Sequence, residues 1–150
     1  MKDPFLMRKI VFIAIAVSFS ACLQVFSDAF IYWQADLLHQ FWRLWTAHWV
    51  HVGWIHYVLN MLAFACLPFI FPRVKGWHFV ALLLLLPPLI SLSFYYGFPE
   101  IEAYAGLSGV LHGAYAAVAS VHLLDKKERN FAVLVLFLLL AKLIWENTMG

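Results

Sequence analysis

Long apolar stretches alternate with short polar, aromatic or charged segments along the whole chain. Five stretches contain almost no charged side chains, and they cover residues 10–26, 51–71, 77–96, 106–124 and 131–145. A helix of about 20 apolar residues is long enough to cross the hydrocarbon core of a bilayer. The pattern therefore predicts five transmembrane helices joined by short connections.

The composition supports a membrane protein. Of the 150 residues, 65% are hydrophobic and 12% are charged, whereas soluble domains are about 45–50% apolar and about 25% charged. This excludes a soluble globular domain and a disordered chain. Five spans leave no room for a second domain, so we predict one all-α, polytopic membrane helix bundle over residues 1–150. The basic residues form no single patch, which argues against a nucleic-acid partner.

The first stretch has a competing interpretation as a cleavable signal peptide, because Ser20-Ala21-Cys22 resembles a lipoprotein cleavage site. The apolar run continues past Cys22 to Phe30, however, and we predict an uncleaved first span.

The distribution of basic residues predicts the orientation. With a cytoplasmic N-terminus, only Arg43 and Lys142 lie outside, and eight basic residues lie inside: Lys2, Arg8, Lys9, Arg73, Lys75, Lys126, Lys127 and Arg129. The positive-inside rule favours this orientation. It places the tryptophan-rich loop at 27–50 and the starts of the second and fourth spans on the outer side, with the loop in the membrane interface.

The third span contains Pro87-Pro88. Proline has no backbone N–H, so the carbonyls of Leu83 and Leu84 lose their helical partners, and we expect a kink there.

Polar side chains are concentrated in the second span. His56 and Asn60 are four residues apart and share one helical face. On a continuous helix, His51 would point about 140° away from His56. His56 and Asn60 either hydrogen-bond to neighbouring helices or donate hydrogen bonds to a ligand.

The fourth span begins with a serine between glycines, in Gly106-Leu107-Ser108-Gly109. The first-turn N–H groups of a helix lack intrahelical acceptors and can donate to an oxyanion. His112 lies one helical turn after Ser108, so it is either a base for Ser108 or a residue that packs beside the site.

Together, Trp42-Arg43, the His51/His56/Asn60 spacing and the Gly106–Gly109 motif resemble the rhomboid family of intramembrane serine proteases. The resemblance covers about residues 8–146 and is greatest to the bacterial rhombosortase branch. It implies that Ser108 is the nucleophile and that His56, Asn60 and the Ser108 N–H form the oxyanion hole. It also implies structural roles near the site for the remaining motif residues: His51, Gly106, Gly109, Trp42 and Arg43.

The same resemblance implies a serine endopeptidase that needs no metal or cofactor. Its substrates would be membrane-anchored proteins, cut near the outer face through an acyl-enzyme and carrying a C-terminal glycine-rich sorting signal before an anchoring helix. The expected location is the bacterial inner membrane, with the active site toward the periplasm.

The sequence departs from the family in one respect. Rhomboids take their catalytic histidine from a sixth span, whereas only five are predicted here, so we expect a C-terminally truncated chain. Three explanations stay open: a fragment of a longer enzyme, an inactive relative that binds other transmembrane helices, or a chain in which His112 is the base. A Ser108–Lys142 dyad and a haem or metal site on His48, His51, His56 and His112 are weaker alternatives.

Overall fold

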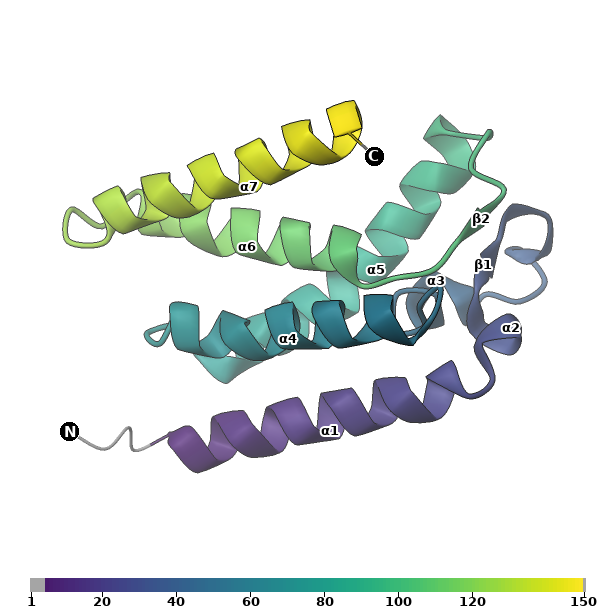
Figure 1. Cartoon of the computed structure of the whole chain (residues 1–150), viewed down its shortest axis with the longest axis horizontal. Coiled ribbons are helices and arrows are strands. Elements are labelled where there is room, and N and C mark those ends of the chain that lie inside the picture. Colours follow the sequence, from purple (N-terminus) through teal and green to yellow (C-terminus); the bar gives the residue numbers. More distant parts are fainter. Residues whose placement is uncertain (1–4, 150) are drawn as a thin grey trace. The chain divides into compact units, whose positions relative to one another are not determined.

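The computed structural model describes residues 5–149, which are predominantly helical (Figure 1). The helices are α1 (Leu6–Gln24), α2 (Ser27–Phe30), α3 (Arg43–Thr46), α4 (Trp54–Ile70), α5 (Gly76–Gly97), α6 (Ser108–His122) and α7 (Arg129–Met149). A short 3₁₀ helix, η1 (Gln34–Asp36), and two strands, β1 (Tyr32–Trp33) and β2 (Ala103–Tyr104), complete the described elements. The five longest helices fall within or closely overlap the five predicted stretches, which confirms the helical membrane-bundle class.

Three of these helices are long and apolar enough to cross a bilayer: α1, α5 and α7. The other two are shorter than a full span, because α4 has 17 residues and α6 has 15. At about 1.5 Å per residue, both fall short of the roughly 30 Å hydrocarbon core. The second span was predicted to begin at His51, but α4 begins at Trp54, directly after Gly53 with a φ of 112°.

The chain divides into two compact units, Met1–Leu111 and His112–Gly150. The first unit holds α1 to α5 and the first turn of α6. The second holds the rest of α6 and α7, joined by a charged turn in which the Lys127 N–H donates to Asp125 Oδ1 at 2.9 Å.

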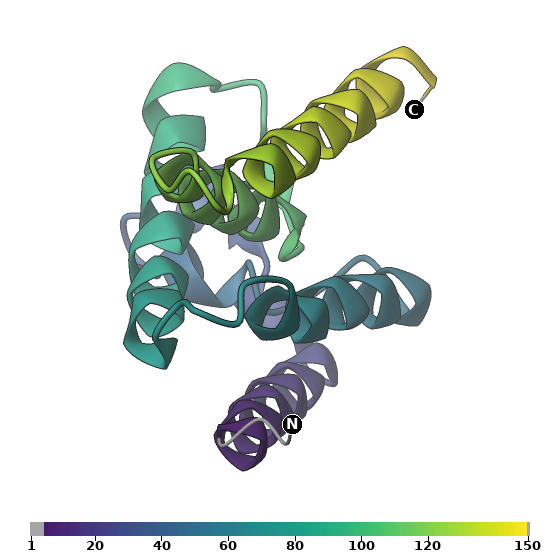
Figure 2. The same cartoon turned by 90° about the vertical axis from the view of Figure 1, so that its left-hand side faces the viewer.

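In the first unit, α1 and α4 lie side by side and antiparallel (Figures 1 and 2). Near the start of α1, Lys9 Nζ is 5.4 Å from the centroid of the Phe69 ring at the end of α4. At the opposite end, the Tyr57 hydroxyl donates to the Val17 carbonyl at 2.9 Å. Figure 2 shows α5 running at a steep angle to α4.

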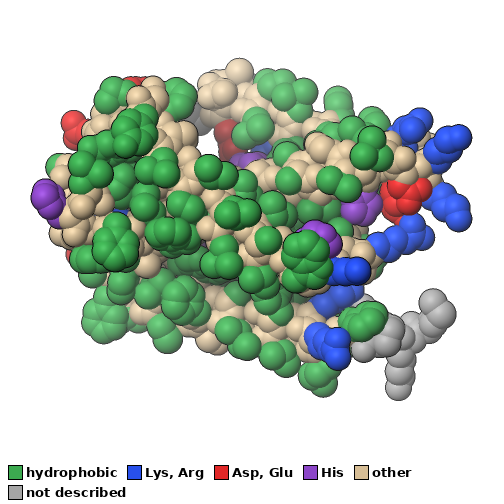
Figure 3. All heavy atoms as spheres, turned by 180° about the vertical axis from the view of Figure 1, so that it is seen from behind, with side chains coloured by type: hydrophobic (Ala, Val, Ile, Leu, Met, Phe, Trp, Pro, Cys, Tyr) green, Lys and Arg blue, Asp and Glu red, His purple; other side chains and the backbone are tan. Residues whose placement is uncertain are grey.

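Exposed apolar side chains cover much of the surface (Figure 3). This is the surface expected of a protein surrounded by lipid, because an apolar face in contact with acyl chains needs no polar cover. The described basic residues of the first unit include Arg8 and Lys9 at the start of α1 and Arg73 and Lys75 between α4 and α5. They therefore lie at the end of the unit away from His51.

The predicted loop at 27–50 contains more structure than the sequence indicated. Its strand β1 pairs antiparallel with β2, with Tyr32 opposite Tyr104 and Trp33 opposite Ala103. Buried Tyr32, Leu37 and Ala47 form a small core beneath this pair. The sheet ties the loop to the segment that leads directly into α6.

Helix α5 continues through Pro87 and Pro88. The Leu84 carbonyl, which a proline at position 88 deprives of its helical partner, accepts a hydrogen bond from the Trp45 indole at 2.9 Å. The indole thus donates to the carbonyl that Pro88 cannot pair with, and this bond anchors α3 to α5.

Candidate active site

The turn that leads into α6 is the centre of the candidate site. Gly106 has a φ of 140°, a conformation that L side chains rarely adopt. Its N–H donates to the Ala47 carbonyl at 3.0 Å. This bond fixes the backbone two residues before Ser108 to the loop that precedes α4.

The imidazole of His56 packs directly against Gly106. A Cβ placed on Gly106 would lie 2.9 Å from His56 Cε1 and 3.5 Å from Nε2. Real Cβ atoms do not approach other heavy atoms so closely, so only glycine allows this contact. The fold therefore brings the His56 ring to the turn before α6.

His51 contacts the same turn. It is 3% exposed, and its Nε2 accepts a hydrogen bond from the Leu107 N–H at 3.4 Å. The His51 and His56 ring centroids are 5.3 Å apart and nearly perpendicular. The prediction that these rings diverge was wrong, because His51 precedes the helix and Gly53 turns the chain between the two residues.

Gln24, the last residue of α1, holds His51 by its backbone. Its Nε2 donates to the His51 carbonyl at 2.9 Å, and its Oε1 accepts from the His51 N–H at 2.7 Å. The sequence analysis missed this contact. A buried glutamine at the end of an apolar helix was the available signal, since a buried amide needs partners.

Asn60 lies one turn beyond His56 and is 6% exposed. Its Nδ2 donates to the His56 carbonyl at 2.9 Å. This bond uses one of the two amide hydrogens. The amide group has a second hydrogen that this bond does not use.

Ser108 is the first residue of α6 and is half-buried. Within residues 5–149, no hydrogen bond is recorded for its hydroxyl. The next residue, Gly109, packs closely against its surroundings, since a Cβ there would lie 3.3 Å from the Tyr104 hydroxyl and 3.6 Å from Ile90 Cδ1. A side chain larger than hydrogen at position 109 would therefore crowd the Tyr104 hydroxyl.

Burial controls the protonation of two loop histidines. Desolvation lowers the pKa of His51 to about 4, and the neighbouring His56 lowers it further in the same direction. Desolvation also lowers the pKa of His48 to about 4, against the opposing effect of the Gly106 and Pro87 carbonyls. Both rings are therefore neutral at pH 7, and a neutral His51 can accept the Leu107 N–H.

Trp42 and Arg43 lie at the far side of the loop. Arg43 is 6% exposed and donates to Gln40 Oε1 at 2.7 Å and to the carbonyls of Asp28 and Ile31. The Trp42 indole donates to the Ala29 carbonyl at 3.4 Å. These hydrogen bonds join parts of the loop to one another, and none of them reaches Ser108.

His112, the first residue of the second unit, has a polar neighbour that the sequence analysis did not foresee. Lys142 Nζ of α7 donates to His112 Nε2 at 2.9 Å and to Glu146 Oε1 at 2.7 Å. An ammonium group carries only donors, so His112 Nε2 accepts in this contact. The contact engages the ring nitrogen that a general base would need.

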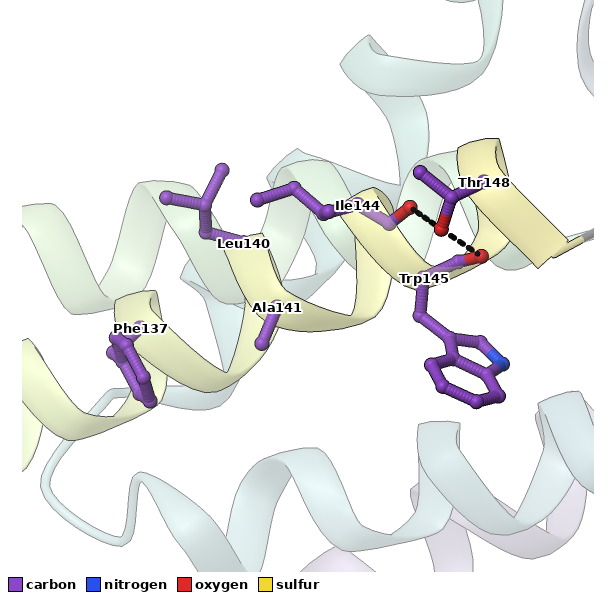
Figure 4. Close-up of a pocket in the computed structure, with 6 residues that line it drawn as sticks. All are labelled: Phe137, Leu140, Ala141, Ile144, Trp145 and Thr148. Carbon is purple, nitrogen blue, oxygen red and sulfur yellow. Dashed lines mark hydrogen bonds between the residues drawn. The ribbon is translucent and has the colours of Figure 1, made fainter.

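A depression lies on α7 in the second unit (Figure 4). It is lined by Phe137, Leu140, Ala141, Ile144, Trp145 and Thr148. The Thr148 hydroxyl donates to the carbonyls of Ile144 and Trp145 in its own helix. This lining offers no catalytic group, and among residues 5–149 no cluster of three or more His, Cys, Asp or Glu side chains is arranged to hold a metal ion.

Comparison with known proteins identifies a family. A family model described as "Rhomboid domain" matches residues 38–150, which is more than half of the chain. Among curated proteins, no significant match to the sequence was found.

Proposed function

This chain belongs to the rhomboid family, and we propose that it is an intramembrane serine endopeptidase with Ser108 as its nucleophile. The observation that carries the proposal is the contact between the His56 ring and Gly106, two residues before Ser108. In this proposal, His56 of α4 donates to the oxyanion beside the first turn of α6.

The proposed reaction is acyl transfer. Ser108 Oγ attacks a substrate peptide carbonyl and passes its proton to a base, which then protonates the leaving amine. His56, Asn60 and the Ser108 N–H donate to the oxyanion of the tetrahedral intermediate. Water then cleaves the Ser108 ester and restores the hydroxyl.

Within this sequence, His112 is the candidate base, because it lies one turn after Ser108 in the same helix. Proton transfer from Ser108 would require its Nε2 to exchange the Lys142 ammonium for the serine hydroxyl. Alternatively, the ring could use its other nitrogen.

We further propose the rhombosortase branch for this chain. Its substrates would be membrane-anchored proteins with a glycine-rich C-terminal sorting signal. The enzyme would lie in the bacterial inner membrane with Ser108 toward the periplasm. The positions of Arg8, Lys9, Arg73 and Lys75 support this orientation, because they lie at the end of the first unit away from His51.

One observation favours a second candidate, an inactive rhomboid-like protein that binds other transmembrane helices. Ser108 has no recorded hydrogen bond within residues 5–149, and His112 Nε2 already accepts from Lys142. A serine hydroxyl at its free pKa is a poor nucleophile without an adjacent base. A binder of this kind would be unaffected by loss of the Ser108 hydroxyl.

The deciding experiment is labelling of the 150-residue chain in membranes with a fluorophosphonate probe. Ser108→Ala and His112→Ala are tested alongside, with Ser93→Ala as a control because Ser93 is exposed and bonds within α5. Labelling that requires both Ser108 and His112 supports a self-sufficient protease. Labelling that requires Ser108 alone supports the nucleophile and excludes His112 as the base, whereas the absence of labelling favours the binder.

A further inference from the structure

His48 is buried at the centre of the first unit, although no recognised motif includes it. It lies in the loop between α3 and α4 and is 0% exposed. Its Nε2 is 3.0 Å from Ser91 Oγ of α5, and its ring centroid is 5.3 Å from that of Tyr104 in β2. A histidine that is fully buried against α5 and β2 requires an explanation.

The hydrogen-bond direction at His48 follows from its partner. Ser91 Oγ donates its one hydrogen to the Leu44 carbonyl at 3.2 Å, so its oxygen is left to accept from the His48 Nε2–H. Leu44 of α3 and His48 just after α3 belong to one continuous segment. Ser91 therefore connects this segment to α5 at two points.

The same loop segment holds the backbone that precedes Ser108. The Gly106 N–H donates to the carbonyl of Ala47, the residue before His48, at 3.0 Å. The Leu107 N–H donates to His51 Nε2 at 3.4 Å. Two consecutive backbone N–H groups before Ser108 are thus held by the segment that contains His48.

We propose that His48 is a positioning residue, which, through its bond to Ser91, fixes the loop segment that accepts the Gly106 and Leu107 N–H groups and so aims the Ser108 N–H at the substrate carbonyl. The inference rests on the proposed function, because the N–H matters as an oxyanion donor. The His51 bond is long at 3.4 Å, so it aligns the Leu107 N–H only if the segment that carries Ala47 and His51 is itself held in place. Misplacement of catalytic groups by about 1 Å can cost about 10²-fold in rate.

The test separates hydrogen bonding from packing at His48. His48→Phe keeps an aromatic ring against Tyr104 but removes the donor to Ser91, and Ser91→Ala removes the acceptor. His48→Gln restores a donor of similar reach. The matched controls are His78→Phe and Ser93→Ala, because both residues are exposed on α5.

The first readout is the rate of fluorophosphonate labelling of the chain in membranes, resolved into probe affinity and the first-order labelling step. We expect His48→Phe and Ser91→Ala to slow the labelling step about 10- to 100-fold with unchanged probe affinity. His48→Gln recovers most of the rate, and both controls label like the wild type. An unchanged labelling step, or a smaller labelled fraction that reacts at the wild-type rate, overturns the inference, because either result means that His48 affects only folding.

The second readout does not depend on activity. Nitrogen NMR of isotope-labelled histidines in detergent reports the hydrogen bond at His51 Nε2. We expect His48→Phe and Ser91→Ala to move this resonance toward that of an imidazole without a donor, and Ser93→Ala to leave it in place. If the wild type does not label, the proposed function fails while this readout still decides the inference, and an unmoved His51 resonance overturns it.

Discussion

The His56 ring lies against Gly106 so closely that a Cβ on Gly106 would be 2.9 Å from His56 Cε1. Gly106→Ala should therefore displace His56 or the turn before Ser108. It also strains the backbone, since φ is 140° at this position. We expect the rate of fluorophosphonate labelling to fall by about 10²-fold or more, because this contact positions both the proposed donor His56 and the proposed nucleophile Ser108.

Gly76→Ala is the matched control, because a Cβ on Gly76 meets no atom within 4 Å. Both variants are compared by labelling rate and by thermal unfolding in detergent. Wild-type labelling in Gly106→Ala would contradict the tight contact.

Asn60 is the second proposed oxyanion donor, and its loss is best tested in the folded protein. Removal of one such donor typically lowers the rate about 10²- to 10³-fold. We expect Asn60→Ala to lower the labelling rate by this amount, with Asn130→Ala on the exposed face of α7 as the control. Since Asn60 also bonds the His56 carbonyl, thermal unfolding is measured in parallel. A proportionate fall in folded protein, with no change in the rate per folded molecule, would assign Asn60 to structure alone.

The length of the apolar stretches was sufficient to predict the five main helices, because apolar length and charge placement are properties of the chain itself. The pairing of β1 with β2 was not predictable in the same way. Each strand has two residues, and Tyr32 and Tyr104 are separated by most of the first unit. Such a short pairing depends on tertiary packing and leaves no periodic pattern.

The candidate site divides along the same line. His56, Asn60 and Ser108 were recognisable because their spacing follows helical geometry and a family motif. Gln24, His48 and Ser91 were not, because each contacts its partner across a distance of at least 27 positions in sequence. The position of His51 was mispredicted because α4 begins only at Trp54, after a turn at Gly53, so His51 lies outside the helix.

The protonation of His48 and His51 predicts how stability depends on pH. Each has a pKa lowered from 6.5 to about 4 by burial, so the unfolded chain binds more protons between these values. Stability should be constant above about pH 7 and fall as the pH decreases toward 4, by about 3 kcal/mol for each ring. Thermal unfolding in detergent across this range measures the loss.

His51→Gln removes one of the two titrating rings and should reduce the pH dependence by about half. His78→Gln is the control, since His78 is exposed at the start of α5. An identical pH dependence in wild type and His51→Gln would show that His51 does not titrate as its burial requires.

The bond between the Trp45 indole and the Leu84 carbonyl predicts a specific coupling with Pro88. In the wild type, Trp45→Phe leaves the Leu84 carbonyl without the donor that replaced its helical partner. An acceptor left unpaired away from water costs about 1–3 kcal/mol. Pro88→Ala restores a backbone N–H at the position that normally bonds this carbonyl. Trp45→Phe should therefore cost less in the Pro88→Ala background than in the wild type, by about 1 kcal/mol in a double-mutant cycle.

The cycle is measured by unfolding in detergent, with Pro87→Ala as the comparison because its N–H would bond Leu83 instead. Equal costs of Trp45→Phe in both backgrounds would mean that the indole bond does not compensate for the proline.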